Sequence, residues 1–165
     1  MTSRAWVSVK FLCIVLFVRR VMQTSNISVL DSQKIAATED DEAAAMENTD
    51  RLDIPAGVEV YEIDGPFFFG LASRFEELEQ MKKAGSTKVR IIRMRKVPFI
   101  DSTGVNNLRS LCERTRKRGI TVILSGVTEK VQATLVKFGV DQEIGVDNIF
   151  PHIVPALAKA KELVK

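Results

Sequence analysis

From residue 55 onward, apolar positions follow two periodicities in turn, one typical of strands and one typical of helices. Short runs rich in β-branched residues predict strands, and longer runs with apolar residues three and four positions apart predict helices. The expected strands are 58–63, 67–70, 88–94 and 120–124, with a short edge element at about 142–144. The expected helices are 72–83, one that follows residues 101–104 and ends near 118, 128–138, and a final one from about 151.

Strands and helices in succession imply right-handed crossovers and parallel pairing of the middle strands. The first two expected strands are separated only by the turn sequence Asp64-Gly65-Pro66, so we expect a hairpin that adds an antiparallel edge. The pattern therefore predicts an α/β fold, with a mixed sheet of about five strands and four or five helices packed against it.

The N-terminal residues 1–30 contain an apolar stretch, 5–18, followed at once by Arg19 and Arg20. About 14 residues of helix rise roughly 21 Å, which is short of the ~30 Å hydrocarbon core of a bilayer. A secretory signal lacks its small-residue cleavage site here, and a surface helix would confine its apolar residues to one face. We favour the inner end of a membrane helix, with Arg19 and Arg20 in the cytosol, over a plain hydrophobic helix.

Residues 31–54 are predicted to form a flexible acidic linker. Four acidic residues at 39–42 are followed by three alanines and more polar residues, with no aromatic side chain. Such a stretch buries too little apolar surface to offset the entropy lost on ordering. The chain thus divides into a hydrophobic segment (1–30), a linker (31–54) and one folded domain (55–165).

The composition of the chain excludes some classes of function. The chain has 165 residues, 45% hydrophobic and 27% charged, which suits one domain with a tail. The formal net charge of +3 and the absence of aromatic-basic interleaving on a strand argue against a nucleic-acid partner. The two cysteines, Cys13 and Cys112, lie in an apolar run and on an expected helix, so we expect no disulfide and a reducing compartment.

The sequence offers no catalytic or metal-binding constellation. His152 is the only histidine, so neither a His-based metal site nor a Ser-His-Asp triad can be assembled, and we expect a helix-start role for it. No Gly-rich nucleotide loop is present. We therefore expect no enzymatic activity, no metal and no cofactor.

Basic residues cluster at two places in the sequence. They could bind anionic lipid headgroups, a nucleotide or an acidic partner, or they could be ordinary solvated helix and strand ends. Arg90 and Arg93, on an expected inner strand, must either reach the sheet's rim or face acidic residues such as Glu59 or Glu62. The clusters are Lys82, Lys83, Lys88, Arg90, Arg93, Arg95 and Lys96, and then Arg114, Arg116, Lys117 and Arg118.

The segment with the strongest functional signal is Asp101-Ser102-Thr103-Gly104, the 101–104 corner, where an expected strand leads into an expected helix. Sites of open α/β sheets gather at such places. Ser102 is predicted as the N-cap, and the free N–H groups of the first turn favour a bound anion or nucleotide phosphate. A phosphate on the hydroxyl would add nearly two negative charges beside Asp101 and change the docking surface. Simple helix capping is the alternative interpretation.

Four sequence blocks, taken in order, resemble the STAS domain at the C-terminal cytosolic end of sulfate permease (SulP) anion transporters. The resemblance covers about residues 57–165 and implies a STAS-like fold, and the N-terminal segment resembles the end of such a transporter's last membrane helix. The blocks are Gly65-Pro66-Phe67-Phe68-Phe69-Gly70, Ile91-Ile92-Arg93-Met94-Arg95-Lys96-Val97-Pro98-Phe99-Ile100-Asp101-Ser102-Thr103-Gly104, Leu124-Ser125-Gly126-Val127 and Asn148-Ile149-Phe150-Pro151-His152-Ile153.

The resemblance also implies site residues. In bacterial anti-sigma-factor antagonists, which share the fold, a partner kinase phosphorylates the hydroxyl residue after the aspartate. That position is Ser102 here, with Thr103 next, whereas many SulP domains have alanine there. The exposed side of the following helix resembles the family's partner-facing surface, and its residues here are Asn106, Asn107, Arg109 and Ser110. One departure is Pro155, which requires that the final helix start late or be kinked.

Together these observations predict a regulatory, protein-binding cytosolic domain of a SulP-type sulfate or related anion transporter. Its partner would be the transporter's membrane domain or another protein, and the N-terminal segment would associate the chain with the membrane. Without the rest of a membrane domain, the chain is not expected to transport an anion. The alternative is a stand-alone phosphoswitch like the anti-sigma-factor antagonists.

Overall fold

The computed structural model describes residues 26–30, 54–65, 67 and 87–165, together with Lys10, Leu12, Cys13 and Leu16. The predicted helix 72–83 and nearly all of the predicted linker lie outside these residues, and so does most of the N-terminal apolar stretch. Its four described residues are helical and exposed. Within the described residues, no helix combines the length and the apolar composition that crossing a bilayer requires.

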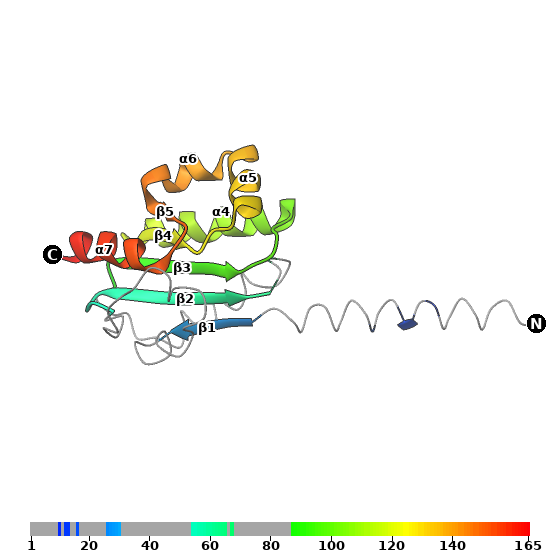
Figure 1. Cartoon of the computed structure of the whole chain (residues 1–165), viewed down its shortest axis with the longest axis horizontal. Coiled ribbons are helices and arrows are strands. Elements are labelled where there is room, and N and C mark those ends of the chain that lie inside the picture. Colours follow the sequence, from blue (N-terminus) through cyan, green and yellow to red (C-terminus); the bar gives the residue numbers. More distant parts are fainter. Residues whose placement is uncertain are drawn as a thin grey trace, which may run out of the picture.

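A five-stranded mixed sheet forms the centre of the molecule, with the strands in sequence order (Figure 1). Strands β2 (Val58–Asp64), β3 (Val89–Lys96), β4 (Thr121–Ser125) and β5 (Ile149–Phe150) pair in parallel. Strand β1 (Asn26–Leu30) pairs antiparallel with β2 and supplies the outer edge. The predictions of a parallel centre and of a mixed sheet of about five strands are confirmed.

The predicted antiparallel hairpin is wrong at Phe67, and residues 68–70 of its second strand lie outside the described residues. The antiparallel edge comes from β1, which lies within the range predicted as the hydrophobic segment. Phe67 instead makes an isolated parallel bridge with Ile100, and its side chain is buried in the core. Gly65 has a φ of 100°, so the chain turns away after β2 and carries Phe67 alongside the segment after β3.

Helices cover both faces of the sheet and enclose two separate cores. Helices α4 (Ser102–Lys117), α5 (Glu129–Lys137) and α6 (Val140–Ile144) contribute to the larger core. Helix α7 (Ile153–Val164) packs its Ile153, Ala156 and Leu157 side chains on the other face. Successive strand residues point to opposite faces, so Ile92 and Met94 enter the first core while Ile91 enters the second.

The start of α7 agrees with the prediction from Pro155. The helix begins at Ile153, so Pro155 occupies its third position, where the missing N–H has no helical acceptor to lose. His152 is the N-cap residue, as predicted for a helix start, and its side chain makes no capping hydrogen bond.

The edge element predicted at about 142–144 is wrong, because these residues belong to helix α6. Val140 and Ile144 lie about one helical turn apart, on the same side of α6, and both pack into the larger core. Gly139 and Gly145 bracket the helix with positive φ angles of 69° and 94°. A 3-10 turn, η1 (Val146–Asn148), then leads into the true edge strand β5.

Candidate functional site

The 101–104 corner joins the carboxyl end of the sheet to helix α4. The N-cap is Asp101, not Ser102 as predicted: Asp101 is extended (φ −95°, ψ 178°), and its carboxylate accepts a 2.6 Å hydrogen bond from the Gly104 N–H. Ser102 is already the first helical residue. Asp101 and Ser102 are exposed, Thr103 is half-buried and Gly104 is buried.

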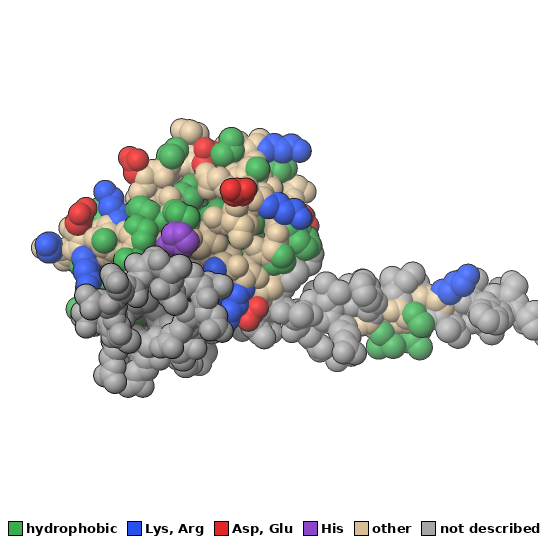
Figure 2. Space-filling view, viewed as in Figure 1, with side chains coloured by type: hydrophobic (Ala, Val, Ile, Leu, Met, Phe, Trp, Pro, Cys, Tyr) green, Lys and Arg blue, Asp and Glu red, His purple; other side chains and the backbone are tan. Residues whose placement is uncertain are grey.

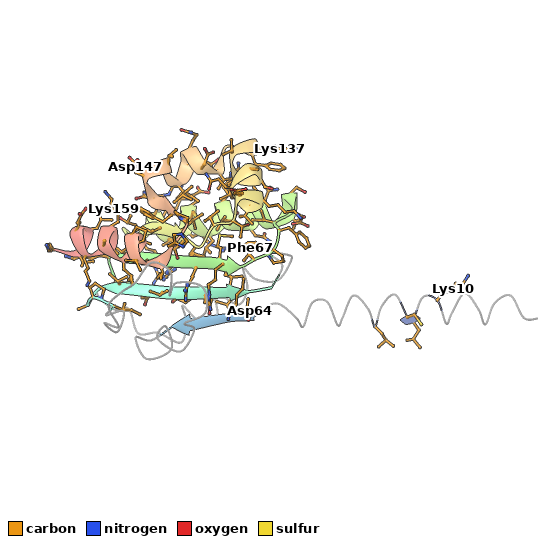
Figure 3. All side chains as sticks on the ribbon, viewed as in Figure 1. Lys10, Asp64, Phe67, Lys137, Asp147 and Lys159 are labelled. Carbon is orange, nitrogen blue, oxygen red and sulfur yellow. The ribbon has the colours of Figure 1, made fainter. Side chains whose placement is uncertain are left out.

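Gly104 shows how tightly the first turn of α4 is packed. A Cβ at this position would collide with the backbone carbonyl of Phe67 and would lie 2.9 Å from Cγ1 of Ile100. Phe67 lies beside the carboxyl end of β3 in Figure 3. The glycine therefore serves close approach between helix and backbone, a requirement that depends on a residue 37 positions away in the sequence.

The predicted partner surface on α4 is only partly available. Asn106 and Ser110 are exposed, and Asn107 is half-buried. Arg109 is half-buried and is bonded to other parts of the domain: its Nε lies 2.8 Å from a carboxylate oxygen of Glu143, and its guanidinium also donates to the Phe138 carbonyl at 2.9 Å. Arg109 thus links α4 to α5 and α6, which leaves Asn106 and Ser110 as the exposed members of this surface.

Three residues of the first basic cluster converge on one buried carboxylate. On the α7 face, Glu62 lies 3.0 Å from Nε of Arg95, 3.3 Å from Nζ of Lys96 and 3.7 Å from a guanidinium nitrogen of Arg93. Glu62 and Arg93 are both buried. Lys96 also pairs with the Asp64 carboxylate at 3.6 Å, so three cations and two carboxylates form one ionic network at the carboxyl ends of β2 and β3.

Arg90 points to the opposite face and has an acidic partner there. It forms a 3.2 Å ion pair with Glu59, approaches the Thr115 hydroxyl at 3.4 Å and stacks over the Tyr61 ring. The prediction that Glu59 and Glu62 face the inner arginines is confirmed. These cations hold the fold together, which weakens the hypothesis that the cluster binds lipid.

The remaining charges form no single large patch on the face shown in Figure 2, where basic and acidic side chains alternate over the described surface. The second cluster lies in and just after the last turn of α4, where cations complement the helix dipole. Lys117 also pairs with Glu113 at 3.0 Å, on the exposed side of the helix.

The geometry supplies little for catalysis. Among the described residues, no three His, Cys, Asp or Glu side chains converge as metal ligands. Cys112 is buried in the core, and burial raises the pKa of its thiol to about 12, which keeps it protonated and poorly nucleophilic. The 101–104 corner offers a capped helix start and an exposed hydroxyl, an arrangement suited to binding.

The Ser125-Gly126 turn is a structural feature that the sequence did not reveal as such. Gly126 has a φ of 67°, and a Cβ there would lie 2.8 Å from the backbone nitrogen of Arg95. The chain leaving β4 therefore crosses directly over β3. A glycine after a strand was the only signal for this contact.

The parallel sheet, the helices on both faces and the capped helix at the carboxyl edge define an open-sheet α/β binding domain. The family model of the STAS domain matches residues 51–156, well over half of the chain. The chain belongs to the STAS domain family.

Two curated relatives are named as sulfate transporters. YvdB of Bacillus subtilis is 25% identical over 143 residues, which are 86% of this chain and 24% of that protein. Sulfate transporter 4.2 of Arabidopsis thaliana is 26% identical over 113 residues, 61% of this chain and 17% of that protein. The chain thus spans about a quarter or less of the length of these relatives.

Solved structures agree with the family. A sulfate transporter family protein from Wolinella succinogenes is 42% identical, with a TM-score of 0.64, and the match covers 76% of this chain and 98% of that one. The STAS domain of a SulP transporter from Vibrio cholerae is 34% identical, with a TM-score of 0.62 over 69% of this chain and 88% of that one. An anti-sigma factor antagonist from Thermotoga maritima, 17% identical with a TM-score of 0.54 over 68% of this chain and 92% of that one, shares the fold.

Proposed function

We propose that this chain is the cytosolic regulatory domain of a SulP-type sulfate or related anion transporter, and that it acts by binding the transporter's membrane domain or another protein. The names of the relatives and the small share of their length that the chain spans both support this proposal. The observation that carries it is the exposed start of α4. Asp101 and Ser102 lie at the surface there, on a helix that Gly104 fixes rigidly to the sheet.

On this proposal, the partner contacts the first turns of α4. Ser102, Asn106 and Ser110 are exposed and four positions apart, so they form one polar stripe along the helix. Arg109 supports the stripe from the side through its bonds to Glu143 and Phe138. The N-terminal segment, with Arg19 and Arg20 after its apolar stretch, keeps the domain at the membrane.

The test uses the full chain and the membrane domain of a SulP transporter from the same organism, reconstituted in liposomes. We expect the chain to bind and to change sulfate uptake, and Asn106→Arg with Ser110→Arg to weaken both effects about tenfold through clash and charge. Lys161→Glu, on the exposed side of α7, is the matched control. Absence of binding, or equal effects of the α4 and α7 variants, contradicts the proposal.

A stand-alone phosphoswitch is the second candidate, favoured by the exposed hydroxyl of Ser102 next to the Asp101 carboxylate. A phosphate at the first helical position would interact well with the α4 dipole, yet it would also face the capping carboxylate. This candidate predicts an ~80 Da mass increase on Ser102 or Thr103 after incubation with a partner kinase. Phosphate incorporation that survives both Ser102→Ala and Thr103→Ala excludes the corner as the switch.

A further inference from the structure

A cavity of about 300 Å³ lies at the end of α4 opposite to the 101–104 corner. It is bounded by α4, the start of β4, α6 and η1. Because α4 has 16 residues, its two ends are about 24 Å apart. Figure 3 shows this separation, with Asp147 of η1 far from Phe67 beside the corner. The residues around the cavity include Cys112, Arg116, Ile120, Val122, Ile144 and Asn148.

The cavity borders a stretch of sheet edge that has no strand partner among the described residues. Strand β5 pairs only with Leu124 and Ser125, so residues 121–123 of β4 have no strand partner on that side among the described residues. Thr121 donates its N–H to the Lys88 carbonyl, on the β3 side. Because successive strand residues point their backbone groups in opposite directions, the N–H and C=O of Val122 point away from β3, on the side of the cavity that Val122 lines. Such an edge is a template for another extended chain.

The floor of the cavity is apolar. The side chains of Cys112, Val122 and Ile144 are at most 7% exposed and belong to the larger core. The Cys112 thiol adds no charge near neutral pH, because burial raises its pKa to about 12. An aliphatic side chain therefore suits this floor better than a polar one.

The guanidinium of Arg116 places a positive charge at the rim of the cavity. Arg116 donates to the Glu143 carbonyl at 2.5 Å, which holds its guanidinium in place. The Glu143 carboxylate pairs with Arg109, at 2.8 and 2.9 Å. Among the described residues, no ion pair joins Arg116 to a carboxylate. Asn148 donates its amide to the Ile144 carbonyl and keeps its oxygen as an acceptor. The rim therefore favours an acidic group.

We propose that this edge binds an extended segment of a partner protein, with an aliphatic side chain in the cavity and an acidic residue two positions away. Side chains two positions apart in a strand lie on the same face, about 6.6 Å from each other. Cys112 in the floor and Arg116 at the rim are four helical positions apart, which is about 6 Å. The segment adds a short strand to β4 beside residues 121–123, and its backbone bonds to Val122.

This partner suits the site better than two other occupants. A small carboxylic acid would use the cavity and Arg116 but would leave the backbone groups of Val122 unpaired. A second copy of this chain would bring its own Arg116 to the same edge, and the like charges would repel each other. The site is distant from the α4 stripe of the proposed function, so either proposal can fail alone.

The test measures the fluorescence anisotropy of a fluorescein-labelled peptide, Glu-Thr-Val-Thr-Glu, added to the full chain. Its symmetric sequence presents an acidic residue to Arg116 in either strand direction. We expect saturable binding that weakens about tenfold with Arg116→Glu and is unchanged with Lys161→Glu on α7. Lys-Thr-Val-Thr-Lys should bind more weakly to the wild-type chain and more tightly to Arg116→Glu.

Backbone methylation of the peptide separates strand pairing from simple cavity filling. Alternate residues of a strand point their N–H groups to opposite sides, so one peptide is N-methylated on Val and Glu and a second on both Thr residues. One methylated peptide should lose binding and the other should keep it. Equal binding of the two, or no effect of Arg116→Gln in a folded variant, overturns the proposal. Self-association of the chain through Val122 overturns it as well, because the edge then belongs to a second copy.

Discussion

The two ends of helix α4 are built in opposite ways. At its start, Asp101 caps the first turn and Gly104 lets the helix touch the Phe67 backbone, so no space remains. At its end, Gly119 has nothing within 4 Å of a Cβ position, and a cavity of about 300 Å³ opens beside Arg116. One end is filled and presents polar groups, while the other is hollow and apolar with a single cation at the rim.

The start of α4 is a rigid surface, whereas the end of α4 has space to accept a side chain from a partner. The filled end cannot adapt its shape, so a partner must bind the exposed groups in the arrangement that they already have. A phosphate on one of these groups would change that arrangement. The hollow end can take a side chain from outside and offers an unpaired strand edge beside it. The two ends therefore suit two different kinds of contact on one domain.

The largest loss of stability is expected from a substitution at the carboxyl edge of the sheet, near the filled end. Glu62→Gln keeps the side chain's size but leaves Arg93, Arg95 and Lys96 around a neutral group. Breaking a buried ion network from one side costs about 3 kcal/mol. We expect the free energy of unfolding, measured with urea, to fall by about that amount.

The control for this change is Glu113→Gln on the exposed side of α4. Its partner Lys117 is solvent-exposed, so the loss of the ion pair should leave the unfolding curve unchanged within error. Equal midpoints for wild type, Glu62→Gln and Glu113→Gln would show that the three cations have no need of the Glu62 charge.

The next prediction compares the loss of stability when the glycine at each end of α4 is replaced by alanine. Gly104→Ala forces a Cβ against the Phe67 carbonyl and should cost about 2 kcal/mol through overpacking. Gly119→Ala meets no atom and should cost only about 1 kcal/mol, because its φ of 76° disfavours a side chain. Urea unfolding of both variants measures the difference. A reversed order would mean that backbone strain outweighs packing at the ends of α4.

A third effect concerns the thiol in the hollow end. Burial raises the pKa of Cys112 from 9.0 to about 12, so above pH 9 the unfolded chain loses this proton while the folded chain keeps it. Stability therefore falls as pH rises from 9 to 12, by up to about 1.4 kcal/mol per pH unit from this group. Cys112→Ala should remove that component, seen as a shallower decline of the unfolding free energy. Parallel declines in both proteins would contradict the shift.

The sequence predicted the filled end well because its signals are local. A strand, a run of Asp-Ser-Thr-Gly and a helix with Val105, Leu108 and Leu111 inward are all read from neighbouring residues. Even so, the cap was assigned to Ser102, because both side chains can cap and only the backbone angle at Asp101 decides between them.

The hollow end could not be predicted, because it forms where segments distant in sequence meet. Its cavity depends on α6, part of which was expected to be a short edge element, and on β5 being only two residues long. The antiparallel edge was missed for the same reason: β1 is separated from its partner β2 by 27 residues, whereas the expected hairpin needed only three. Pairing over such distances leaves little trace in local periodicity.

The smallest change in stability is expected at Asp101, where two substitutions distinguish the contribution of its hydrogen bond from that of its charge. Asp101→Ala removes the acceptor of the Gly104 N–H and should cost about 1 kcal/mol in the free energy of unfolding. Asp101→Asn keeps an acceptor oxygen and loses only the charge near the α4 N-terminus, so its cost should be a few tenths of a kcal/mol. If the two variants lose the same amount in urea unfolding, the carboxylate acts through its charge on the helix dipole. If only the alanine variant loses stability, the 2.6 Å hydrogen bond is what fixes the first turn, and the exposed Ser102 hydroxyl beside it is free to serve a partner.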